Sequence, residues 1–276
     1  MNITRRIHLN PQSKGNIGKS FETEFRVAWL DRLGVAWNGS DLDDRHHSFA
    51  KRHPETVRSY RLENEHESKA ALLSLFRRVL KDTAPVHVID TRAQADALIL
   101  SAMEKLQLLE LCAEQGVRLT FFLFPTDDVD SMSNVGQIFL FAGDRVDYVI
   151  VHNPIKVRGE LFRGSGLEKQ LRAFGAKEIT LSAITPPTRL AMEKAETIAK
   201  CGLSFAEQSH LEAGHLDRMF GGELQWAMRE MFHQYDEIAH LLLPTDLIPE
   251  KRAAPATTRP KAAPQIDFNF EDRYGE

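Results

Sequence analysis

The sequence predicts an α/β fold in which a mostly parallel central sheet is flanked by helices. Three observations support this prediction. Short apolar runs alternate with longer amphipathic stretches, a pattern typical of a parallel sheet wrapped by helices. The run at residues 117–124 is rich in Leu and Phe, as expected of a strand buried on both faces. A loop that contains Gly15 and Gly18 joins the first apolar run to the first amphipathic stretch.

The predicted strands are short apolar runs that end at turn-forming or polar residues. The first run ends at Asn10-Pro11, and the second ends at the polar residues 38–40, before an acidic cluster. Pro125 ends the buried run. The predicted strands, in order, are residues 6–9, 35–37, 86–89, 117–124, 146–151 and 177–181.

The predicted helices carry apolar residues at helical spacing and are bounded by glycine or proline. Gly34 ends the first helix, Gly116 ends the third, and Pro186-Pro187 precede the fifth. The last helical stretch is expected to break at Gly214 and at Gly221-Gly222. In order, the predicted helices are residues 20–33, 67–81, 93–115, 129–141, 188–200 and 205–243.

One domain is expected over residues 1–243, with a sheet-bearing core at 1–200 and a C-terminal helical extension at 204–243. Residues 244–276 are predicted to form a disordered tail, because the tail is rich in Ala and Pro and lacks periodicity. The tail ends in an alternating apolar and acidic motif at 266–270, which we interpret as a candidate recruiting segment for a protein partner.

Composition narrows the classes of function. The net charge of −4 gives no overall basic field, so contact with nucleic acid requires a local patch. The two cysteines form no metal-ligand pattern, which indicates a reducing compartment. No run of about 18 apolar residues occurs, and the N-terminus does not resemble a signal peptide. We therefore expect a cytoplasmic protein without a transmembrane segment.

The loop after the first strand has the chemistry of a phosphate-binding loop, or P-loop. It reads Lys14-Gly15-Asn16-Ile17-Gly18-Lys19-Ser20 and stands between a strand and a helix. Glycines let backbone amides turn toward phosphate oxygens, and the helix points its positive N-terminus at the ligand. Lys19 suits the β- and γ-phosphates, and the Ser20 hydroxyl suits Mg²⁺. Ser13 stands where the general motif has its first glycine.

This segment resembles the deviant Walker A loop of the ParA/MinD family of P-loop ATPases, which lacks that first glycine and carries an extra lysine, here Lys14. Further landmarks of the family are matched by Asp41-Leu42-Asp43 after the second strand, Asp90 after the next, and Asn153 after a later one. The resemblance spans roughly residues 5 to 200. Within the family, the plasmid TraL/StbB-like branch is the most similar.

The resemblance implies a role for each matched residue. ATP with Mg²⁺ is expected between two copies of the chain, with Lys14 reaching the partner's phosphates and Asp43 orienting the attacking water, so these two are the candidate catalytic residues. Ser20, Asp41 and Asp90 are the candidate Mg²⁺ residues. The candidate nucleotide-binding residues are Lys14, Gly15, Asn16, Ile17, Gly18, Lys19, Ser20, Phe21 and Asn153.

The sequence departs from the family at two places. Asn16 replaces a glycine of the loop, which the fold can accept because Asn tolerates positive φ better than most residues. The segment Asp90-Thr91-Arg92-Ala93 differs from the family's usual Asp-x-Pro-Pro. We therefore expect nucleotide binding with slow hydrolysis.

A basic cluster follows the strand that ends near Asn153, and members of the family that bind DNA use surface lysines and arginines. The candidate DNA patch consists of Lys156, Arg158, Arg163, Lys169 and Arg172. An ordinary charged surface explains the same residues equally well.

Three functions remain open from the sequence. The first is a nucleotide-switched ATPase that forms an ATP-sandwich dimer and serves plasmid or DNA partition, conjugation or intracellular positioning. The second is a small-molecule kinase or other phosphotransferase in which residues 45–65 shape an acceptor pocket. The third is a non-catalytic nucleotide-binding adaptor that recruits a partner through the tail motif at 266–270.

Overall fold

A computed structural model describes residues 2–43, 47–62, 65–155 and 160–249. The tail motif at 266–270 and the rest of the predicted tail beyond residue 249 lie outside the described residues. Among the described residues, no helix has both the length and the apolar character needed to cross a membrane.

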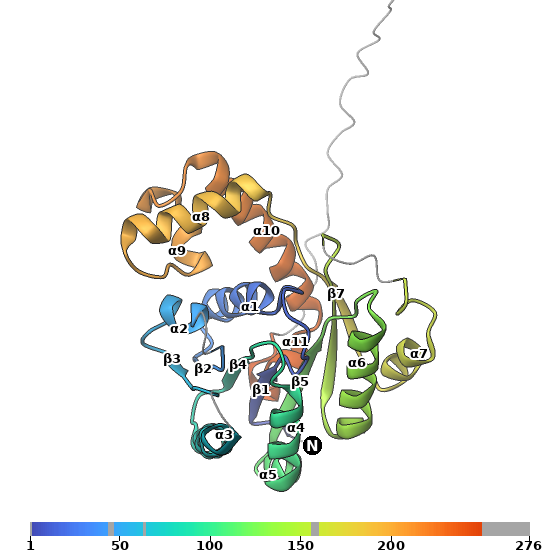
Figure 1. Ribbon diagram of the computed structural model, residues 1–276. Helices are drawn as coiled ribbons and strands as arrows, with labels where there is room; N and C mark the ends of the chain where they lie inside the picture. Colours follow the sequence, from blue (N-terminus) through green and yellow to red (C-terminus); the bar gives the residue numbers. More distant parts are fainter. Residues whose placement is uncertain (1, 44–46, 63–64, 156–159, 250–276) are drawn as a thin grey trace, which may run out of the picture.

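The described part of the chain is built around a seven-stranded sheet with the order β3-β2-β4-β1-β5-β6-β7, and each pair of neighbouring strands is parallel (Figure 1). The predicted α/β fold with a parallel sheet is therefore confirmed. The strands are β1 (Arg5–Leu9), β2 (Trp37–Asp41), β3 (Val57–Ser59), β4 (Val86–Asp90), β5 (Val117–Leu123), β6 (Asp147–His152) and β7 (Lys177–Thr180).

Helices cover both faces of the sheet. The helices α1, α8, α9 and α10 lie together on one side, while α3, α4, α5 and α6 lie on the other (Figure 1). Their bounds are α1 (Lys19–Leu33), α2 (Ser48–Arg52), α3 (Glu65–Lys81), α4 (Asp96–Lys105), α5 (Leu108–Glu114), α6 (Val129–Ala142), α7 (Gly166–Ala173), α8 (Pro186–Ala199), α9 (Phe205–Ser209), α10 (Arg218–Glu237) and α11 (Ala239–Leu242).

Each face of the sheet has its own apolar core, and β5 shows how the strands serve both. Phe121 and Leu123 point into the core beneath α3 to α6, whereas Phe122 packs into the core beneath α1 and α10. Alternate residues of a strand point to opposite faces, so a strand covered on both sides is apolar at most of the positions that it buries. This is why the run at 117–124 predicted its strand so clearly.

The second strand lies later in the chain than its apolar run predicted. It spans Trp37–Asp41 and therefore includes the polar residues that we expected to end it. Gly39 fits there because a Cβ would lie 2.7 Å from a methyl group of Val57. The Ser40 hydroxyl is buried but donates a hydrogen bond to His87 Nε2 at 2.9 Å. Contacts with neighbouring strands thus allow these polar residues to lie inside a buried strand.

Other elements also differ from the prediction, and the short helices α2 and α7 were not predicted. The edge strand β3 is too short and polar to show a pattern. The stretch 93–115 forms two helices, α4 and α5, separated where Gln107 takes a positive φ of 48°. The helix α10 runs unbroken through Gly221-Gly222. Gly221 is needed for close approach, because a Cβ would lie 2.6 Å from a methyl group of Leu211.

The C-terminal helical extension is part of the same core. Residues of α10 and α11 pack against α1 and the sheet. The carbonyl groups at the end of α11 accept hydrogen bonds from buried polar side chains of the sheet: Arg6 Nε donates to Leu243 at 3.2 Å, and His8 Nε2 donates to Leu242 at 2.9 Å. Unpaired carbonyls at a helix end are costly to bury, so these side chains fix where the extension docks.

A buried chain of hydrogen bonds links β2 and β4, and it gives a pH prediction. Asp82 accepts from His87 Nδ1 at 2.6 Å and from Asn38 at 2.8 Å. Partial burial alone raises the pKa of Asp82, but the hydrogen bonds from His87, Ala84 and Asn38 outweigh it and lower the pKa to about 2. Although Ser40, His87 and Asp82 are connected like a hydrolase triad, the Ser40 side chain is buried at 0% exposure, so we assign them a structural role.

Because the folded-state pKa of Asp82 is depressed, its contribution to stability is complete above about pH 4 and is lost as the pH falls toward 2. We expect Asp82→Asn to lower the free energy of unfolding by about 1–2 kcal/mol at pH 7 and to flatten its pH dependence between about pH 4 and 2. Urea unfolding at several pH values measures this. An unchanged acid slope in the variant would contradict the assignment.

Candidate phosphate-loop site

The loop between β1 and α1 adopts the conformation that anion binding requires. Gly18 stands at the N-cap of α1 with a φ of 103°, a value that L side chains rarely adopt. Asn16 has a positive φ of 59°, so the expectation that Asn can serve here in place of glycine is met. The first turn of α1 therefore follows directly on the loop, and the free amide groups of this turn lie next to the loop.

The loop is clamped from two neighbouring strands of the sheet. Asn153, just beyond β6, donates from Nδ2 to the carbonyl oxygen of Ile17 at 2.9 Å, and its Oδ1 accepts from the Ile155 amide at 3.2 Å. A Cβ at Gly18 would lie 2.8 Å from Asn153 Nδ2 and 2.9 Å from Leu181 Cδ2. Gly18 is thus required both by its backbone angle and by its neighbours. Asn153 thus holds the loop itself.

Lys19 is a buried cation, with only 6% of its surface exposed. Its ammonium group donates to the carbonyl oxygen of Gln12 at 2.5 Å and to that of Arg92 at 3.4 Å. Burial lowers the pKa of Lys19 to about 8, although the carboxylates of Asp90, Asp96 and Asp43 oppose the shift. A cation held only by neutral carbonyls interacts strongly with an anion that reaches it, because the surroundings screen it weakly.

The two buried aspartates at the strand ends have different surroundings. Asp41 uses both carboxylate oxygens locally, accepting from the amide of Asp43 at 2.8 Å and from that of Ala50 at 3.0 Å. It therefore shapes the turn after β2 and holds α2. Neither carboxylate oxygen of Asp90 accepts a hydrogen bond of normal geometry from the described residues, although both are buried.

The surroundings of Asp90 also perturb its protonation. Burial raises the pKa of Asp90 to about 7; the nearby Asp41 adds to the shift, and the Ser20 hydroxyl and the cations of Lys19 and Arg26 oppose it. A buried carboxylate whose charge the Ser20 hydroxyl and the nearby cations only partly offset is costly unless a further cation joins it. Oxygen ligands of this kind suit Mg²⁺, so the residues present fit a magnesium ion beside Ser20.

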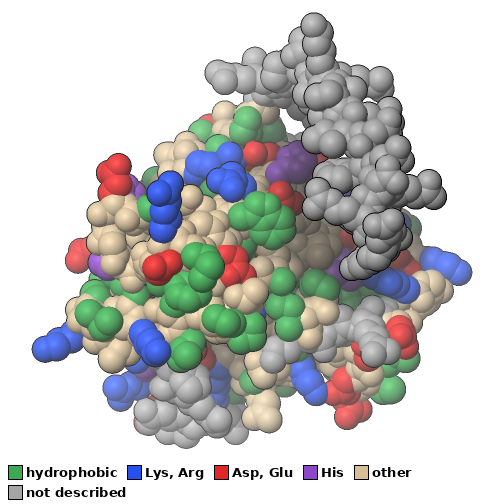
Figure 2. Space-filling view, turned by 90° about the horizontal axis from the view of Figure 1, so that it is seen from above, with side chains coloured by type: hydrophobic (Ala, Val, Ile, Leu, Met, Phe, Trp, Pro, Cys, Tyr) green, Lys and Arg blue, Asp and Glu red, His purple; other side chains and the backbone are tan. Residues whose placement is uncertain are grey.

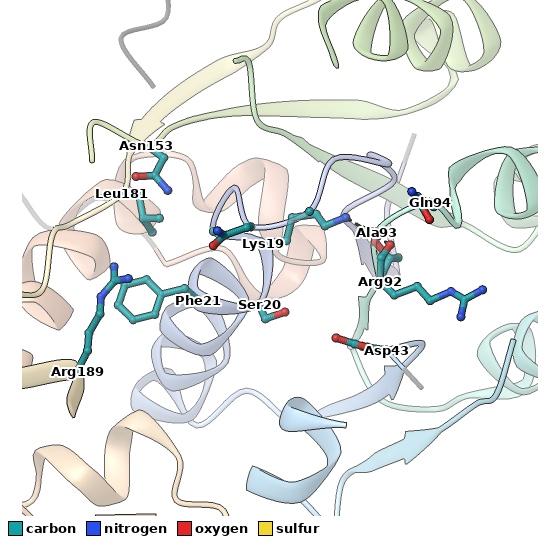
Figure 3. A pocket seen from close by; sticks show the side chains of 14 residues that line it. Lys19, Ser20, Phe21, Asp43, Arg92, Ala93, Gln94, Asn153, Leu181 and Arg189 are labelled. Atoms are coloured by element: carbon teal, nitrogen blue, oxygen red, sulfur yellow. Dashed lines mark hydrogen bonds between the residues drawn. The ribbon is translucent and has the colours of Figure 1, made fainter. Parts of the chain in front are cut away.

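A cavity of about 510 Å³ opens over the loop at the carboxyl ends of the strands. In Figure 3, Lys19 and Ser20 lie in the middle of this cavity, with Asp43 and Arg92 toward one side. Phe21, Leu181, Asn153 and Arg189 lie toward the other. The cavity therefore has a charged end and an end with an aromatic and an apolar side chain, separated by the loop.

Lys14, the expected cross-subunit lysine, pairs within its own chain. Its ammonium group forms an ion pair with Asp128, and 45% of the lysine side chain remains exposed. Asp128 is also the N-cap of α6 and accepts from the amides of Asp130 at 2.9 Å and Ser131 at 3.4 Å. Exposed ion pairs contribute little stability, so Lys14 can leave this partner at little cost.

The candidate DNA patch is only partly visible. Lys156 and Arg158 lie outside the described residues. Arg172 pairs with Glu168 at 2.8 Å and with Glu178 at 2.6 Å, which offsets its charge. Arg163 and Lys169 are exposed. On the face shown in Figure 2, blue and red side chains are interspersed where grey atoms do not cover them.

Several cavity residues were not among the candidate site residues of the sequence. They come from the loop after β4, the residue after β7 and the first turn of α8, and are Thr91, Arg92, Ala93, Gln94, Leu181 and Arg189. Their only signal is position, because each follows a predicted strand, and ligands of open α/β sheets bind outside the carboxyl ends of strands. Thr91 also ties its loop to the site by donating from Oγ1 to the Asn10 carbonyl oxygen at 2.5 Å.

No protein-family model matches the chain, and no curated protein matches it. Among solved structures, it is similar to the signal recognition particle receptor FtsY from Elizabethkingia anophelis, at 10% identity and a TM-score of 0.44, over 83% of this chain and 65% of that one. The MinD cell division protein of Aquifex aeolicus matches at 12% identity and a TM-score of 0.38, over 82% and 97%. A de novo designed protein with a P-loop NTPase fold matches at 18% identity and a TM-score of 0.32, over 63% and 94%.

This chain thus spans just under two thirds of the length of that FtsY chain. These similarities are too low to assign residues, so the site is defined by the chain's own geometry. It consists of the loop after β1 at the edge of the parallel sheet and the residues that surround this loop.

The packing around Gly18 predicts an unequal response to alanine. We expect Gly18→Ala to lower the free energy of unfolding by about 2–3 kcal/mol, because it combines backbone strain with contacts to Asn153 and Leu181. Gly34→Ala is the matched control, since Gly34 ends the same helix with a φ of 66° and nothing lies within 4 Å of its Cβ position. It should cost only about 1 kcal/mol. Chemical unfolding measures both, and equal losses would contradict the packing argument.

Proposed function

We propose that this chain binds ATP with Mg²⁺ in the cavity over the phosphate loop and hydrolyses it slowly, as a nucleotide switch. The observation that carries the proposal is a buried Lys19 ammonium held by carbonyls at the N-terminus of α1, close to the buried carboxylate of Asp90. The oxygens of Asp90 accept no hydrogen bond of normal geometry from the described residues. The buried ammonium group and the buried carboxylate are each costly without a ligand. A phosphate chain pairs with the ammonium group, and its metal ion pairs with the carboxylate.

The loop and the first turn of α1 bind the phosphates. Positive φ at Asn16 and Gly18 turns the loop, and the free amides of the first helical turn attract phosphate oxygens. Lys19 shifts from the Gln12 carbonyl to a phosphate, a stronger partner because both groups are charged. The α1 N-terminus and Lys19 thereby address the same anion.

Ser20 and Asp90 hold Mg²⁺ on the charged side of the cavity. Ser20 lines the cavity and Asp90 lies buried next to it. When bound, Mg²⁺ withdraws charge from the phosphate oxygens. Asp41 supports the site by fixing the turn to Asp43, and Asp43 orients a water molecule from the cavity wall. The altered segment after Asp90, which brings Arg92 to the same wall, is why we propose slow turnover.

The nucleotide-binding part of the proposal is tested by removing the buried cation. We expect Lys19→Ala to weaken ATP binding about 10- to 100-fold, the value of one or two charge-assisted hydrogen bonds. Lys105→Ala, which removes an exposed lysine from α4, is the control and should bind normally. Isothermal titration calorimetry with Mg²⁺ and ATP gives both affinities. Normal binding by a folded Lys19→Ala protein would refute this use of the loop.

The proposed switch is an ATP-sandwich homodimer in which Lys14 reaches the partner's phosphates. Support comes from the exposure of Lys14 and from its weak, solvent-exposed partner Asp128, which it can exchange for a phosphate. A cation delivered across an interface stabilises charge that builds up during phosphoryl transfer.

We expect Lys14→Ala to remain monomeric with a slowly hydrolysed ATP analogue, under conditions in which the parent chain dimerises. Asp128→Asn is the matched variant, because it frees Lys14 without removing it and should still dimerise. Size-exclusion chromatography with light scattering, in ADP and in the analogue, measures the mass. A Lys14→Ala dimer that forms as readily as the parent's would rule out the sandwich.

We propose that the switch serves plasmid or DNA partition, conjugation or intracellular positioning in the cytoplasm, with the residues 163, 169 and 172 contributing to a DNA patch. Chromatography of the chain with DNA tests the DNA patch, because elution of the chain together with DNA only when ATP is present supports it.

The segment that the kinase hypothesis assigns to an acceptor pocket contains α2 and β3, and β3 extends the sheet. The adaptor hypothesis depends on the motif at 266–270, outside the described residues.

A further inference from the structure

The end of the cavity opposite Asp43 and Arg92 contains an arginine that the proposed phosphate chemistry does not use. Arg189 lies in the first turn of α8 and points toward the Phe21 ring in Figure 3. Its guanidinium carbon lies 4.9 Å from the centroid of that ring. Among the described residues it forms no ion pair, and its Nε atom is buried without a hydrogen-bond partner. Arginine usually satisfies its donors when partly buried, so this one is short of acceptors.

Both halves of this pair are held rigidly. The Phe21 ring packs edge-on against Phe25 at 5.0 Å and against Phe205 at 5.1 Å between ring centroids. The N-terminus of α8 is tied to α10, because the Glu223 carboxylate accepts from the amide of Thr185 at 2.7 Å and also from the Thr188 hydroxyl. The ring and the helix turn that carries Arg189 are thus held in place, and a guanidinium over an aromatic ring offers a flat stacking surface.

The other side chains at this end determine what can bind there. Leu181 supplies an apolar wall, and a Cβ at Gly18 would lie 2.9 Å from its methyl group, so it is close to the loop. Asn153 donates one amide proton to the Ile17 carbonyl oxygen and accepts a hydrogen bond from the Ile155 amide. Among the described residues that line the cavity, Asp43 is the one carboxylate, and it lies toward the opposite end. This end therefore suits a flat ring that presents hydrogen-bond acceptors.

We propose that the nucleobase of the bound nucleotide stacks on the guanidinium of Arg189, which Phe21 supports from behind and Leu181 flanks. Arg189 then helps the site to distinguish a nucleotide from a bare phosphate chain. This inference rests on the proposed function, since the phosphates must occupy the loop. It follows from position, because the loop separates the phosphate end of the cavity from the Arg189 end.

The experiment compares ATP with inorganic tripolyphosphate, which has the same chain of phosphates and no base. Isothermal titration calorimetry with Mg²⁺ gives the affinity of each probe for the full chain. In the parent protein, ATP should bind at least about tenfold more tightly than tripolyphosphate, as expected of one stacked base. Arg189→Met should lose most of this advantage while keeping its affinity for tripolyphosphate. GTP, measured alongside, shows how the stacking surface ranks the two purines.

Two further variants separate stacking from charge. Lys194→Met is the matched control, since it removes one exposed positive charge from the same helix and should leave both affinities unchanged. Arg189→Lys keeps the charge and loses the plane, so it should behave like Arg189→Met. Thermal unfolding of each variant establishes that it is folded.

Several outcomes would overturn the inference. Equal affinity of the parent protein for ATP and tripolyphosphate means that no base is bound, and this result needs no variant. If Arg189→Met loses affinity for ATP and for tripolyphosphate equally, Arg189 contacts the phosphates. If Arg189→Lys binds ATP as tightly as the parent protein, Arg189 contributes only its charge. Failure of the proposed function is distinct, because the parent protein then binds neither probe.

Discussion

The buried ammonium group of Lys19 is the interaction on which the rest of the site depends. Removing a cation from water is costly, and here two backbone carbonyls and nearby carboxylates only partly offset that cost. One carbonyl belongs to Gln12, whose own side chain donates to the Phe124 carbonyl oxygen at 3.0 Å. The position of Lys19 is thereby coupled to β5 as well as to β1. The loop is held in an anion-binding shape before any anion is present, which lowers the entropy lost on binding.

The parallel sheet explains why these groups meet. In a parallel sheet all strands end at the same edge, so the loops after β1, β2, β4, β6 and β7 come together although they are far apart in the sequence. Asp41 and Asp90 are neighbours in register on β2 and β4. Asn153 and Leu181 approach the loop from the other side. The loop after β1, the two buried aspartates and the side chains around Phe21 therefore meet as a consequence of one arrangement of strands.

Much of the fold was predictable because it is written in local patterns. Runs such as 117–124 are apolar at nearly every position, and Gly34 and Gly116 mark chain reversals by the φ values that they allow. Elements with weaker local signals were placed wrongly or missed. The second strand contains Asn38, Gly39 and Ser40, whose polar groups and missing side chain suit partners on β3, on β4 and just after α3 that no local pattern reveals. The same holds for Gly221, which permits contact with Leu211 and does not break its helix.

The sequence by itself determined the phosphate loop, its lysine and serine, and the acidic residues at the strand ends, because each depends on residue type and short spacing. The tertiary structure alone decided how those residues are used. Both oxygens of Asp41 accept from backbone amides, whereas those of Asp90 accept no hydrogen bond of normal geometry from the described residues. Asn153 donates to the loop. The tertiary structure also brought Arg189 over Phe21. Burial and hydrogen-bond partners arise from packing between distant segments, so a one-dimensional pattern cannot specify them.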